Sequence, residues 1–282
     1  MSKINCDDLK NKTAVITGGY GVIGTALVKS MAYAGVKTAV IGRNREKAEK
    51  LANAVWKETG VVSKGYSADV TDKNMLEEVK KQINNDLGAV DFLINAAGGN
   101  APEATTKLEQ LKLENFDELI NSFFGLDISG FDFVFDLNLK GTVLPSMIFS
   151  KDMVINKKGV IVNISSMSAF KPLTKIPAYS AAKAAVNNFT QWLAVHFAKT
   201  GVRVNAIAPG FFLTDQNRFL LLNKNGKPTE RGQKIINNTP MGRYGDVEEL
   251  QGTLIYLLSD ISKFITGIVI PVDGGYNAFG GV

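Results

Sequence analysis

The sequence predicts an α/β fold in which one doubly wound parallel sheet of about seven strands carries helices on both faces. Three observations support this prediction. Short β-branched runs alternate with helix-like segments, the runs are apolar throughout, and no linker, repeat or change of composition divides the 282 residues. Parallel strands buried on both faces have such continuous apolar runs, and right-handed crossovers place the helices on both sides. We therefore expect a single domain over residues 1–282.

The expected elements follow one another along the whole chain. The strands are Thr13–Ile16, Lys37–Ile41, Val61–Tyr66, Val90–Ile94, Val160–Ile164, Arg203–Ile207 and Ile268–Val272. Helix-like segments lie between them, among them Arg45–Thr59, Asn74–Asn84, Thr142–Ile155, Tyr179–Lys199 and Val247–Leu258. Two longer connections stand out, an insertion around residues 99–135 and a segment around 211–245.

The composition narrows the possible functions. One histidine and one cysteine, Cys6, cannot supply the usual Cys/His ligands of a zinc site within one chain. The net charge of +5 is spread without basic blocks, which disfavours a nucleic-acid partner. Charges interrupt the longest apolar region, Phe123–Phe149, and the N-terminal residues contain no apolar segment. We therefore expect no membrane span and no secretion signal, and the lone cysteine suits the cytoplasm.

The stretch TGGYGVIG, residues 17–24, lies between an expected strand and an expected helix. Its Gly19, Gly21 and Gly24 match the pattern G-x-G-x-x-G. Such glycines permit a tight turn and bring the backbone close to a pyrophosphate at a helix N-terminus. The alternative is a plain turn in a chain that contains 27 glycines.

Polar or turn residues follow five further strands at the point where each one ends. They are Gly42-Arg43, Asp69, Asn95, Ser165-Ser166 and Pro209-Gly210. The carboxyl ends of parallel strands lie at one edge of the sheet, where open α/β sheets bind ligands. This repeated placement favours a dinucleotide site at that edge.

The residues after the second strand bear on the choice of cofactor. An acid there would accept hydrogen bonds from the ribose hydroxyls of NAD, but the chain has Gly42 followed by Arg43. A guanidinium suits a 2′-phosphate, which favours NADP(H). The alternative is that Arg43 stacks on the adenine and recognises no phosphate.

A possible reaction centre lies in YSAAK, residues 179–183. Tyr179 and Lys183 are four residues apart and project from one face of a helix. A phenol has a pKa of about 10, too high for acid–base work at neutral pH, and a nearby ammonium lowers it. Tyr179 could then protonate a carbonyl oxygen that Ser166 also hydrogen-bonds, without a metal. The alternative is a core tyrosine beside a solvated lysine.

These motifs together resemble the short-chain dehydrogenase/reductase family over essentially the whole chain. The resemblance implies an NAD(P)-dependent, metal-independent enzyme that oxidises CH–OH groups or reduces carbonyls. Tyr179 would be the acid/base, Lys183 would bind the nicotinamide ribose, Ser166 would orient the carbonyl, and Asn138 would hold a water in the proton relay. The implied cofactor contacts are Gly18, Gly21, Ile23, Gly24, Arg43, Asp69, Val70, Asn95, Ala96, Gly98, Tyr179, Lys183, Pro209 and Thr214.

One departure from the family concerns the glycine loop. The family pattern is T-G-x-x-x-G-x-G, and Val22 stands where the middle glycine is usual. This puts the contacts of Tyr20, Gly21 and Val22 in question.

Longer pieces such as FFLTDQNRFLL and RGQKIINNTPMGRYG resemble the D-mannonate oxidoreductase (D-fructuronate reductase) branch of the family. That resemblance implies reversible reduction of the keto group of D-fructuronate, with NAD(H) as the customary cofactor, and the family resemblance implies a tetramer. The alternatives are a 3-oxoacyl-thioester reductase, a gluconate or polyol dehydrogenase, and a catalytically silent dinucleotide sensor. The sensor is disfavoured because Asn138, Ser166, Tyr179 and Lys183 are all present.

Segment 211–245 lies where the family has its substrate lid. Between Arg218 and Arg243 it carries six basic residues and one acid, which could clamp a small polyhydroxylated carboxylate. We expect Asn100, Gln216 and Arg218 to contact the substrate. One alternative is that these charges are solvated. Another is an apolar lid, which Phe211 and Phe212 would favour.

Overall fold

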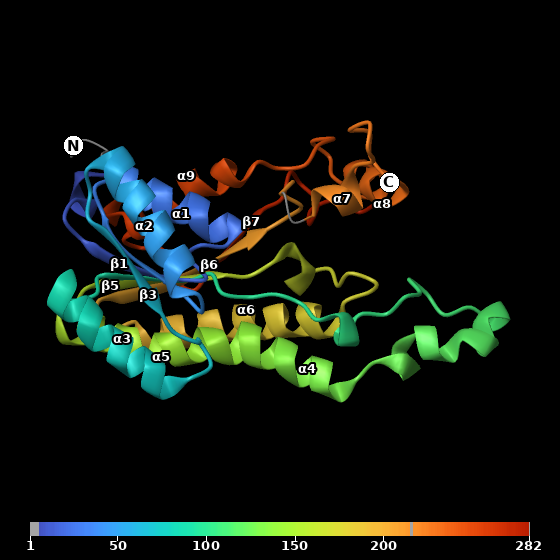
Figure 1. Cartoon of the computed structure of the whole chain (residues 1–282), viewed down its shortest axis with the longest axis horizontal. Coiled ribbons are helices and arrows are strands. Elements are labelled where there is room, and N and C mark those ends of the chain that lie inside the picture. The colour runs from blue at the N-terminus through green and yellow to red at the C-terminus, as the bar shows by residue number, and fades with distance from the viewer. Residues whose placement is uncertain (1–5, 215–216, 282) are drawn as a thin grey trace.

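Seven parallel strands form one sheet through the middle of the molecule, in the order β3-β2-β1-β4-β5-β6-β7 (Figure 1). The computed structural model describes residues 6–214 and 217–281, the side chain of residue 115 excepted. The strands are β1 (Thr13–Thr17), β2 (Lys37–Gly42), β3 (Ser63–Ser67), β4 (Phe92–Asn95), β5 (Gly159–Ile164), β6 (Val202–Pro209) and β7 (Val269–Val272). The predicted doubly wound parallel sheet is confirmed.

The topological switch point lies between β1 and β4. Thr17 at the end of β1 is in register with Ile41 of β2 on one side and with Asn95 of β4 on the other. The chain runs outward from β1 to β3, returns to β4 and continues to β7. Doubly wound sheets bind ligands in the crevice that this reversal leaves at the carboxyl ends of the strands.

Helices cover both faces of the sheet (Figure 1). Helices α1 (Val22–Tyr33), α2 (Arg45–Thr59) and α9 (Gln251–Leu258) lie on one face, and α3 (Lys73–Asp86), α5 (Gly141–Ile155) and α6 (Pro177–Phe197) lie on the other. Because side chains alternate along a strand, Ala14 and Ile16 of β1 pack in the first cluster and Val15 packs in the second. Both faces are therefore buried, as the apolar runs predicted.

Local signals explain where most elements begin. The side chain of Asn44 accepts a hydrogen bond from the Lys47 amide at the start of α2, and Asp72 does the same for α3. Pro177 stands in the first turn of α6, which begins two residues before the predicted Tyr179. The predicted helix 247–258 is in fact a 3₁₀ turn, η7 (Val247–Leu250), followed by α9.

Two long connections extend beyond the same end of the sheet (Figure 1). Residues 99–135 contain the 3₁₀ turns η2 (Pro102–Ala104), η3 (Leu113–Asn121) and η4 (Phe123–Gly125) and the helix α4 (Ile128–Phe135). The segment 211–245 contains α7 (Arg218–Leu221) and α8 (Glu230–Asn237). An ion pair of 3.4 Å between Lys234 Nζ and Glu109 Oε2 joins the two segments.

The remaining elements are the 3₁₀ turns η1 (Asp7–Leu9), η6 (Met167–Ala169) and η8 (Asp260–Ser262) and the π-helical turn η5 (Asp136–Lys140). Within the described ranges, every helix is too short or too polar to cross a bilayer.

Candidate active site

A cavity of about 790 Å³ opens at the carboxyl ends of β1, β2 and β4. The structure brings ten of the predicted cofactor residues to its wall: Gly18, Gly21, Ile23, Gly24, Arg43, Asp69, Val70, Ala96, Gly98 and Thr214. They come from five separate connections of the chain and meet at the switch point. This is the site that the residues at the strand ends predicted.

The glycine loop forms the floor of this cavity. Gly18 has a left-handed backbone with φ of +62°, and a Cβ there would lie 2.8 Å from the Ala97 backbone. A Cβ at Gly24 would lie 2.8 Å from Gly19 Cα and still closer to Gly18 O, so α1 packs directly on the loop. Gly21 is less restricted, because its nearest neighbour, Gly18 O, would be 3.1 Å from a Cβ there.

The departure at Val22 does not disturb this loop. Gly21 is the N-cap of α1 and Val22 is its first helical residue, and both line the cavity. The amide of Gly21 donates to Gly18 O at 2.9 Å and closes the turn. The helix N-terminus therefore faces the cavity, where it favours the negative charge of a phosphate.

Asp69 supplies an ionised carboxylate at the wall of the cavity near β2 and β3. The Thr71 hydroxyl and amide donate to its Oδ1 at 2.7 and 2.8 Å. The hydroxyl bond, followed by the amide bond and the charges of Arg43 and Lys140, holds the pKa of this carboxyl below its usual range against the opposing effect of burial. Asp69 is therefore an acceptor at neutral pH.

Asn138 lies in the π-helical turn η5 between α4 and α5. Its side chain is fully buried; Nδ2 donates to Gly99 O at 2.7 Å and to Val134 O at 2.8 Å, and Oδ1 accepts from the Gly99 amide. The extra residue of a π turn is often found at functional sites. Here it turns Asn138 toward the loop after β4 and fixes that loop against the helices.

Lys183 and Asn138 meet at Gly98, on the wall of the cavity. A Cβ at Gly98 would lie 2.7 Å from Asn138 Oδ1 and 3.1 Å from Lys183 Nζ. Lys183 is buried, and its ammonium donates to Ile164 O at 2.8 Å. An ammonium has three N–H donors. Among the described contacts one of them is used by Ile164 O, so two remain for a ligand. A ligand that reaches Gly98 therefore comes within reach of Lys183.

Tyr179 and Ser166 complete the group of predicted catalytic residues. The Lys183 ammonium lies 5.6 Å from the centre of the Tyr179 ring. Ser166 lies two residues after β5 as the N-cap of η6, and its hydroxyl accepts from the amide and hydroxyl of Ser168 at 3.1 and 2.9 Å. The Tyr179 hydroxyl also interacts with Ser166. The structure thus brings together Asn138 from η5, Ser166 from the turn after β5, and Tyr179 and Lys183 from α6.

The expected effect of Lys183 on the phenol is not found in the protein alone. Burial raises the pKa of Tyr179, and the hydrogen bond with Ser166 only partly opposes this rise. Burial also lowers the pKa of Lys183 to about 8. In this state burial sets the direction of the Tyr179 pKa shift, and its depression by Lys183 stays a prediction. The physical reason is that desolvation penalises both charged forms.

Four predicted cofactor residues do not line the described wall of the cavity: Tyr179 and Lys183, whose contacts are given above, and Asn95 and Pro209. The side chain of Asn95 has the same parity as Leu93, so it faces α5; its Nδ2 donates to Ser146 Oγ at 3.0 Å and to Asn163 Oδ1 at 2.8 Å. Pro209 is buried as the last residue of β6, and the following Gly210 lines the cavity in its place. The alternation of side chains along a strand decides the outcome for Asn95 and Pro209.

The predicted substrate residues are only partly placed. Asn100 is exposed and donates to Thr105 Oγ1 at 2.8 Å, and Arg218 is exposed at the start of α7. Gln216 lies outside the described residues. Of the other basic residues of segment 211–245, Lys234 pairs with Glu230 and Glu109, and Arg243 pairs with Glu249. Lys224, Lys227 and Arg231 are exposed. Within the described part of the chain, none of these basic side chains lines the dinucleotide cavity, and the clamp stays a prediction.

Several residues on the cavity wall were missed by sequence reasoning: Thr71, Phe133, Asp136, Leu137 and Asn217. Asn217 has a clear local role, because it accepts from the Thr214 amide at 2.8 Å and donates to Phe212 O at 2.8 Å. Phe133 had no signal of its own in the sequence, since it reaches the cavity only through the path of the insertion, whereas Phe211 and Phe212, named above for an apolar lid, do line the cavity.

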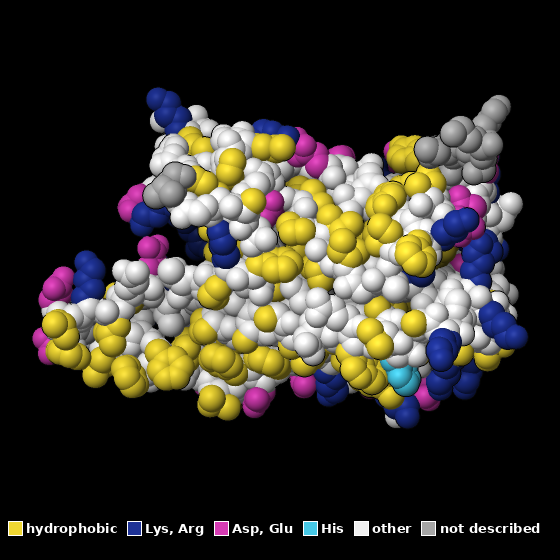
Figure 2. All heavy atoms as spheres, turned by 180° about the vertical axis from the view of Figure 1, so that it is seen from behind, with side chains coloured by type: hydrophobic (Ala, Val, Ile, Leu, Met, Phe, Trp, Pro, Cys, Tyr) yellow, Lys and Arg dark blue, Asp and Glu magenta, His cyan; other side chains and the backbone are white. Residues whose placement is uncertain are grey.

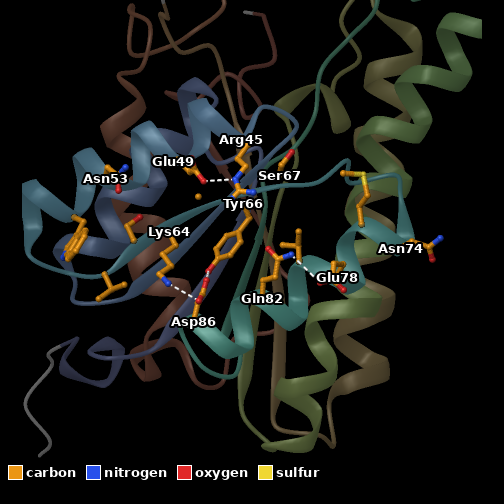
Figure 3. A pocket seen from close by; sticks show the side chains of 16 residues that line it. Arg45, Glu49, Asn53, Lys64, Tyr66, Ser67, Asn74, Glu78, Gln82 and Asp86 are labelled. Atoms are coloured by element: carbon orange, nitrogen blue, oxygen red, sulfur yellow. Dashed lines mark hydrogen bonds and ion pairs between the residues drawn. The ribbon is translucent and has the colours of Figure 1, made fainter.

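A second hollow of about 750 Å³ lies along the edge strand β3, between α2 and α3 (Figure 3). Its labelled charges satisfy one another: Arg45 pairs with Glu49, and Asp86 receives both Lys64 Nζ at 3.0 Å and the Tyr66 hydroxyl at 2.8 Å. The predicted catalytic residues belong to the other edge of the molecule. We therefore assign no chemistry to this hollow.

The fold and the site define a class of protein, the dinucleotide-dependent oxidoreductases. The cavity fits a dinucleotide because its floor is the glycine turn at the N-terminus of α1, where Gly18 and Gly24 leave no room for a Cβ, and because the buried Lys183 ammonium lies beside Gly98 of its wall. No group of three His, Cys, Asp or Glu side chains within the described ranges could hold a metal ion. When bound, NAD(P) supplies or accepts the hydride in such a site.

Comparison with known proteins identifies the family. The model described as enoyl-(acyl carrier protein) reductase matches residues 21–277, and the chain belongs to this short-chain dehydrogenase/reductase family. It is an NAD(P)-dependent oxidoreductase that acts on CH–OH groups. The predicted family, enzyme class and cofactor type are confirmed.

Three relatives are similar over nearly the whole chain. An uncharacterized oxidoreductase of Haemophilus influenzae is 49% identical, with 98% of this chain and 96% of the relative covered. The uncharacterized oxidoreductase UxuB of Bacillus subtilis is 48% identical, with 98% of both covered. A crystal structure from Haemophilus influenza, described provisionally as a D-mannonate oxidoreductase with bound NAD, has a TM-score of 0.93, 48% identity, and coverage of 98% and 99%.

Proposed function

We propose that the protein transfers a hydride between NAD(P)H and the keto group of a sugar acid, with D-fructuronate and D-mannonate as the substrate pair. The observation that carries this proposal is the convergence of Tyr179, Ser166 and Lys183 beside a dinucleotide cavity in a chain 48% identical to a protein described as a D-mannonate oxidoreductase. The small-molecule substrate follows from the family, and its identity is the proposal.

Tyr179 is proposed as the acid in the reductive direction. Its raised pKa keeps the phenol protonated at neutral pH, so it can donate a proton to the substrate oxygen as the carbonyl carbon gains the hydride. The Ser166 hydroxyl donates a hydrogen bond to the same oxygen and stabilises the negative charge that develops there. In the oxidative direction, Tyr179 takes the proton back.

Lys183 and Asn138 are proposed to support this exchange. Lys183 would hold the nicotinamide ribose with the donors that Ile164 O leaves available, and its ammonium would lower the phenol pKa once the site is filled. Asn138 would hold the loop at Gly98 and Gly99 in place. Asn138 would also hold a water molecule that takes part in the proton relay.

The competing function is reduction of a 3-oxoacyl thioester. The specific observation that favours it is the aromatic and aliphatic part of the cavity wall, formed by Phe133, Leu137, Phe211 and Phe212, together with the absence of an assembled basic clamp among the described residues. An apolar wall suits an acyl chain better than a polyhydroxylated acid.

The test is reduced-cofactor oxidation by the purified protein with D-fructuronate, run separately with NADH and NADPH. A panel of a 3-oxoacyl thioester, 5-keto-D-gluconate and keto pentoses serves as comparison. A kcat/KM for D-fructuronate that exceeds every other member supports the proposal. A higher kcat/KM for the thioester would replace it with the competing function.

We also propose a homo-oligomer, with the tetramer as the form that the family resemblance implies, in the cytoplasm, where a free Cys6 stays reduced. Hydrophobic side chains gather along the projecting segment and the adjoining helices (Figure 2). They include Leu113, Ile120, Phe123, Phe124 and Ile128, and on α5 and α6 Met147, Ile155, Trp192 and Val195. Apolar surfaces of this extent are typical of subunit contacts, and light scattering after size-exclusion chromatography measures the mass directly.

A further inference from the structure

The end of β2 lacks the residue that commonly selects NAD. In doubly wound sheets an acidic side chain at this position accepts hydrogen bonds from the adenosine ribose, or a nearby arginine accommodates a 2′-phosphate. The last residue of β2 is Gly42, and Arg43 follows with its side chain exposed. Gly42, Arg43 and Tyr20 all line the dinucleotide cavity.

Tyr20 occupies the space that a side chain at position 42 would need. A Cβ at Gly42 would lie 2.8 Å from Tyr20 Cδ1 and Cζ, and closer still to Cε1. The ring therefore packs directly on the glycine backbone, and the absence of a side chain at position 42 is a condition of that packing. An acid in this position is excluded as long as the ring is there.

The Tyr20 hydroxyl also engages the turn that follows β2. The Asn44 amide donates to this hydroxyl at 3.0 Å. Backbone amides before a helix are the donors that bind phosphate in many nucleotide sites, and this one is already used. A hydroxyl that accepts one bond can still donate its own proton, so Tyr20 can bind an uncharged ribose hydroxyl.

Little uncompensated positive charge near Arg43 is left to bind a phosphate. Asp69 lines the same cavity and is ionised, and Arg43 contributes to the low pKa of that carboxyl. A 2′-phosphate would add roughly two negative charges beside this carboxylate. Arg45, the next cation along the chain, pairs with Glu49 at 2.8 Å. An unphosphorylated ribose carries no charge and is not repelled by the Asp69 carboxylate.

We propose that Tyr20 determines the choice of dinucleotide: its ring on Gly42 and its hydroxyl on the Asn44 amide make the site bind NAD(H) in preference to NADP(H). Tyr20 thus replaces the acidic residue of the usual NAD site by occupying its place. The inference rests on the dinucleotide site of the proposed function and does not depend on which keto acid is reduced. Under this proposal Arg43 does not bind a 2′-phosphate.

The experiment is calorimetric titration of the substrate-free protein with NADH and with NADPH. The wild-type protein is expected to bind NADH more tightly. In Tyr20→Ala the preference shrinks by about tenfold or more, mainly because NADPH binds better once the Asn44 amide is released. Tyr20→Phe keeps the ring on Gly42 but also frees the Asn44 amide, so its preference for NADH should fall between that of the wild type and that of Tyr20→Ala. Thermal melting of each variant shows that the protein is folded.

A paired substitution tests the steric argument independently. Gly42→Asp alone should weaken both cofactors, since the new side chain meets the Tyr20 ring. Tyr20→Ser combined with Gly42→Asp should restore NADH binding and lower NADPH affinity further. Gly42→Asp that binds NADH as the wild type does would show that the ring leaves this position free, and would overturn the proposal.

Two further results would also overturn it. One is a wild-type protein that binds NADPH at least as tightly as NADH and loses that affinity in Arg43→Ala. The other is a Tyr20→Ala variant in which both affinities change equally. Failure of the sugar-acid substrate in the activity test would leave these titrations unaffected, because they contain no keto acid.

Discussion

The Lys183 ammonium lies 5.6 Å from the centre of the Tyr179 ring; Lys183 is buried and Tyr179 is partly buried. Burial acts on them in opposite directions: it raises the pKa of the phenol and lowers that of the ammonium to about 8. Both groups are therefore biased toward their neutral forms. A Cβ at Gly98 would lie 3.1 Å from Lys183 Nζ. A ligand that binds at Gly98 therefore changes the surroundings of the Lys183 ammonium.

Replacing the phenol tests the proton donor. Tyr179→Phe should lower kcat by about 10²- to 10⁴-fold, because it removes the acid and little else. The dissociation constant for NADH should stay within about twofold, a difference of about 0.4 kcal/mol. Tyr256→Phe, on the surface of α9, is the matched control and should leave both quantities unchanged. Turnover near the wild-type level in Tyr179→Phe would remove Tyr179 from the mechanism.

The buried lysine predicts a dependence of stability on pH. From about pH 8 to 10.5 the unfolded chain holds a proton on Lys183 that the folded chain has lost. Stability therefore rises with pH across this window, and the full cost of burying the charge is present below it. The contribution reaches up to about 3 kcal/mol.

Urea unfolding of wild type and Lys183→Met on both sides of this window isolates the effect. Lys183→Met should be the more stable protein near neutral pH, and its advantage should shrink as the pH rises toward 10.5. A difference between the two proteins that does not change with pH would mean that Lys183 keeps its ordinary pKa in the fold.

The glycine loop permits a comparison between two neighbouring glycines. Gly24→Ala places a Cβ against the backbone of Gly18 and Gly19, which cannot move without opening the loop. We expect NADH affinity to fall by about tenfold or more. Gly21→Ala, whose nearest neighbour would be 3.1 Å away at an ordinary φ of −67°, should have a much smaller effect. Equal losses in the two variants would contradict the account of α1 packing on the loop.

Asn138 is predicted to position the loop after β4. Asn138→Ala removes two donors from the carbonyls of Gly99 and Val134 and should cost about 1–3 kcal/mol of unfolding free energy. Cofactor affinity should fall together with turnover, since the loop carries Gly98 on the cavity wall. Asn156→Ala, exposed at the end of α5, is the control. Unchanged cofactor affinity in Asn138→Ala would exclude a positioning role.

Much of the fold was predictable because local patterns carry it. Apolar runs marked all seven strands. The helix α2 has the predicted bounds Arg45–Thr59 because Asn44 caps its start and the left-handed Gly60 ends it. The bounds of β3, β4 and β6 each differ by two residues at one end, and β3 shows one reason. It begins at Ser63, two residues after the predicted Val61, because as an edge strand it needs fewer apolar residues.

The candidate site divides in the same way. The sequence alone determined that glycines at 18 and 24 follow a strand and that Tyr179 and Lys183 share a helix face, since both relations hold within one or two turns of chain. The tertiary structure decided the rest: the side of the sheet that Asn95 faces, the Tyr20 ring on Gly42, and the sign of the Tyr179 pKa shift. These depend on groups far apart in the chain and on burial, and neither is encoded in local spacing.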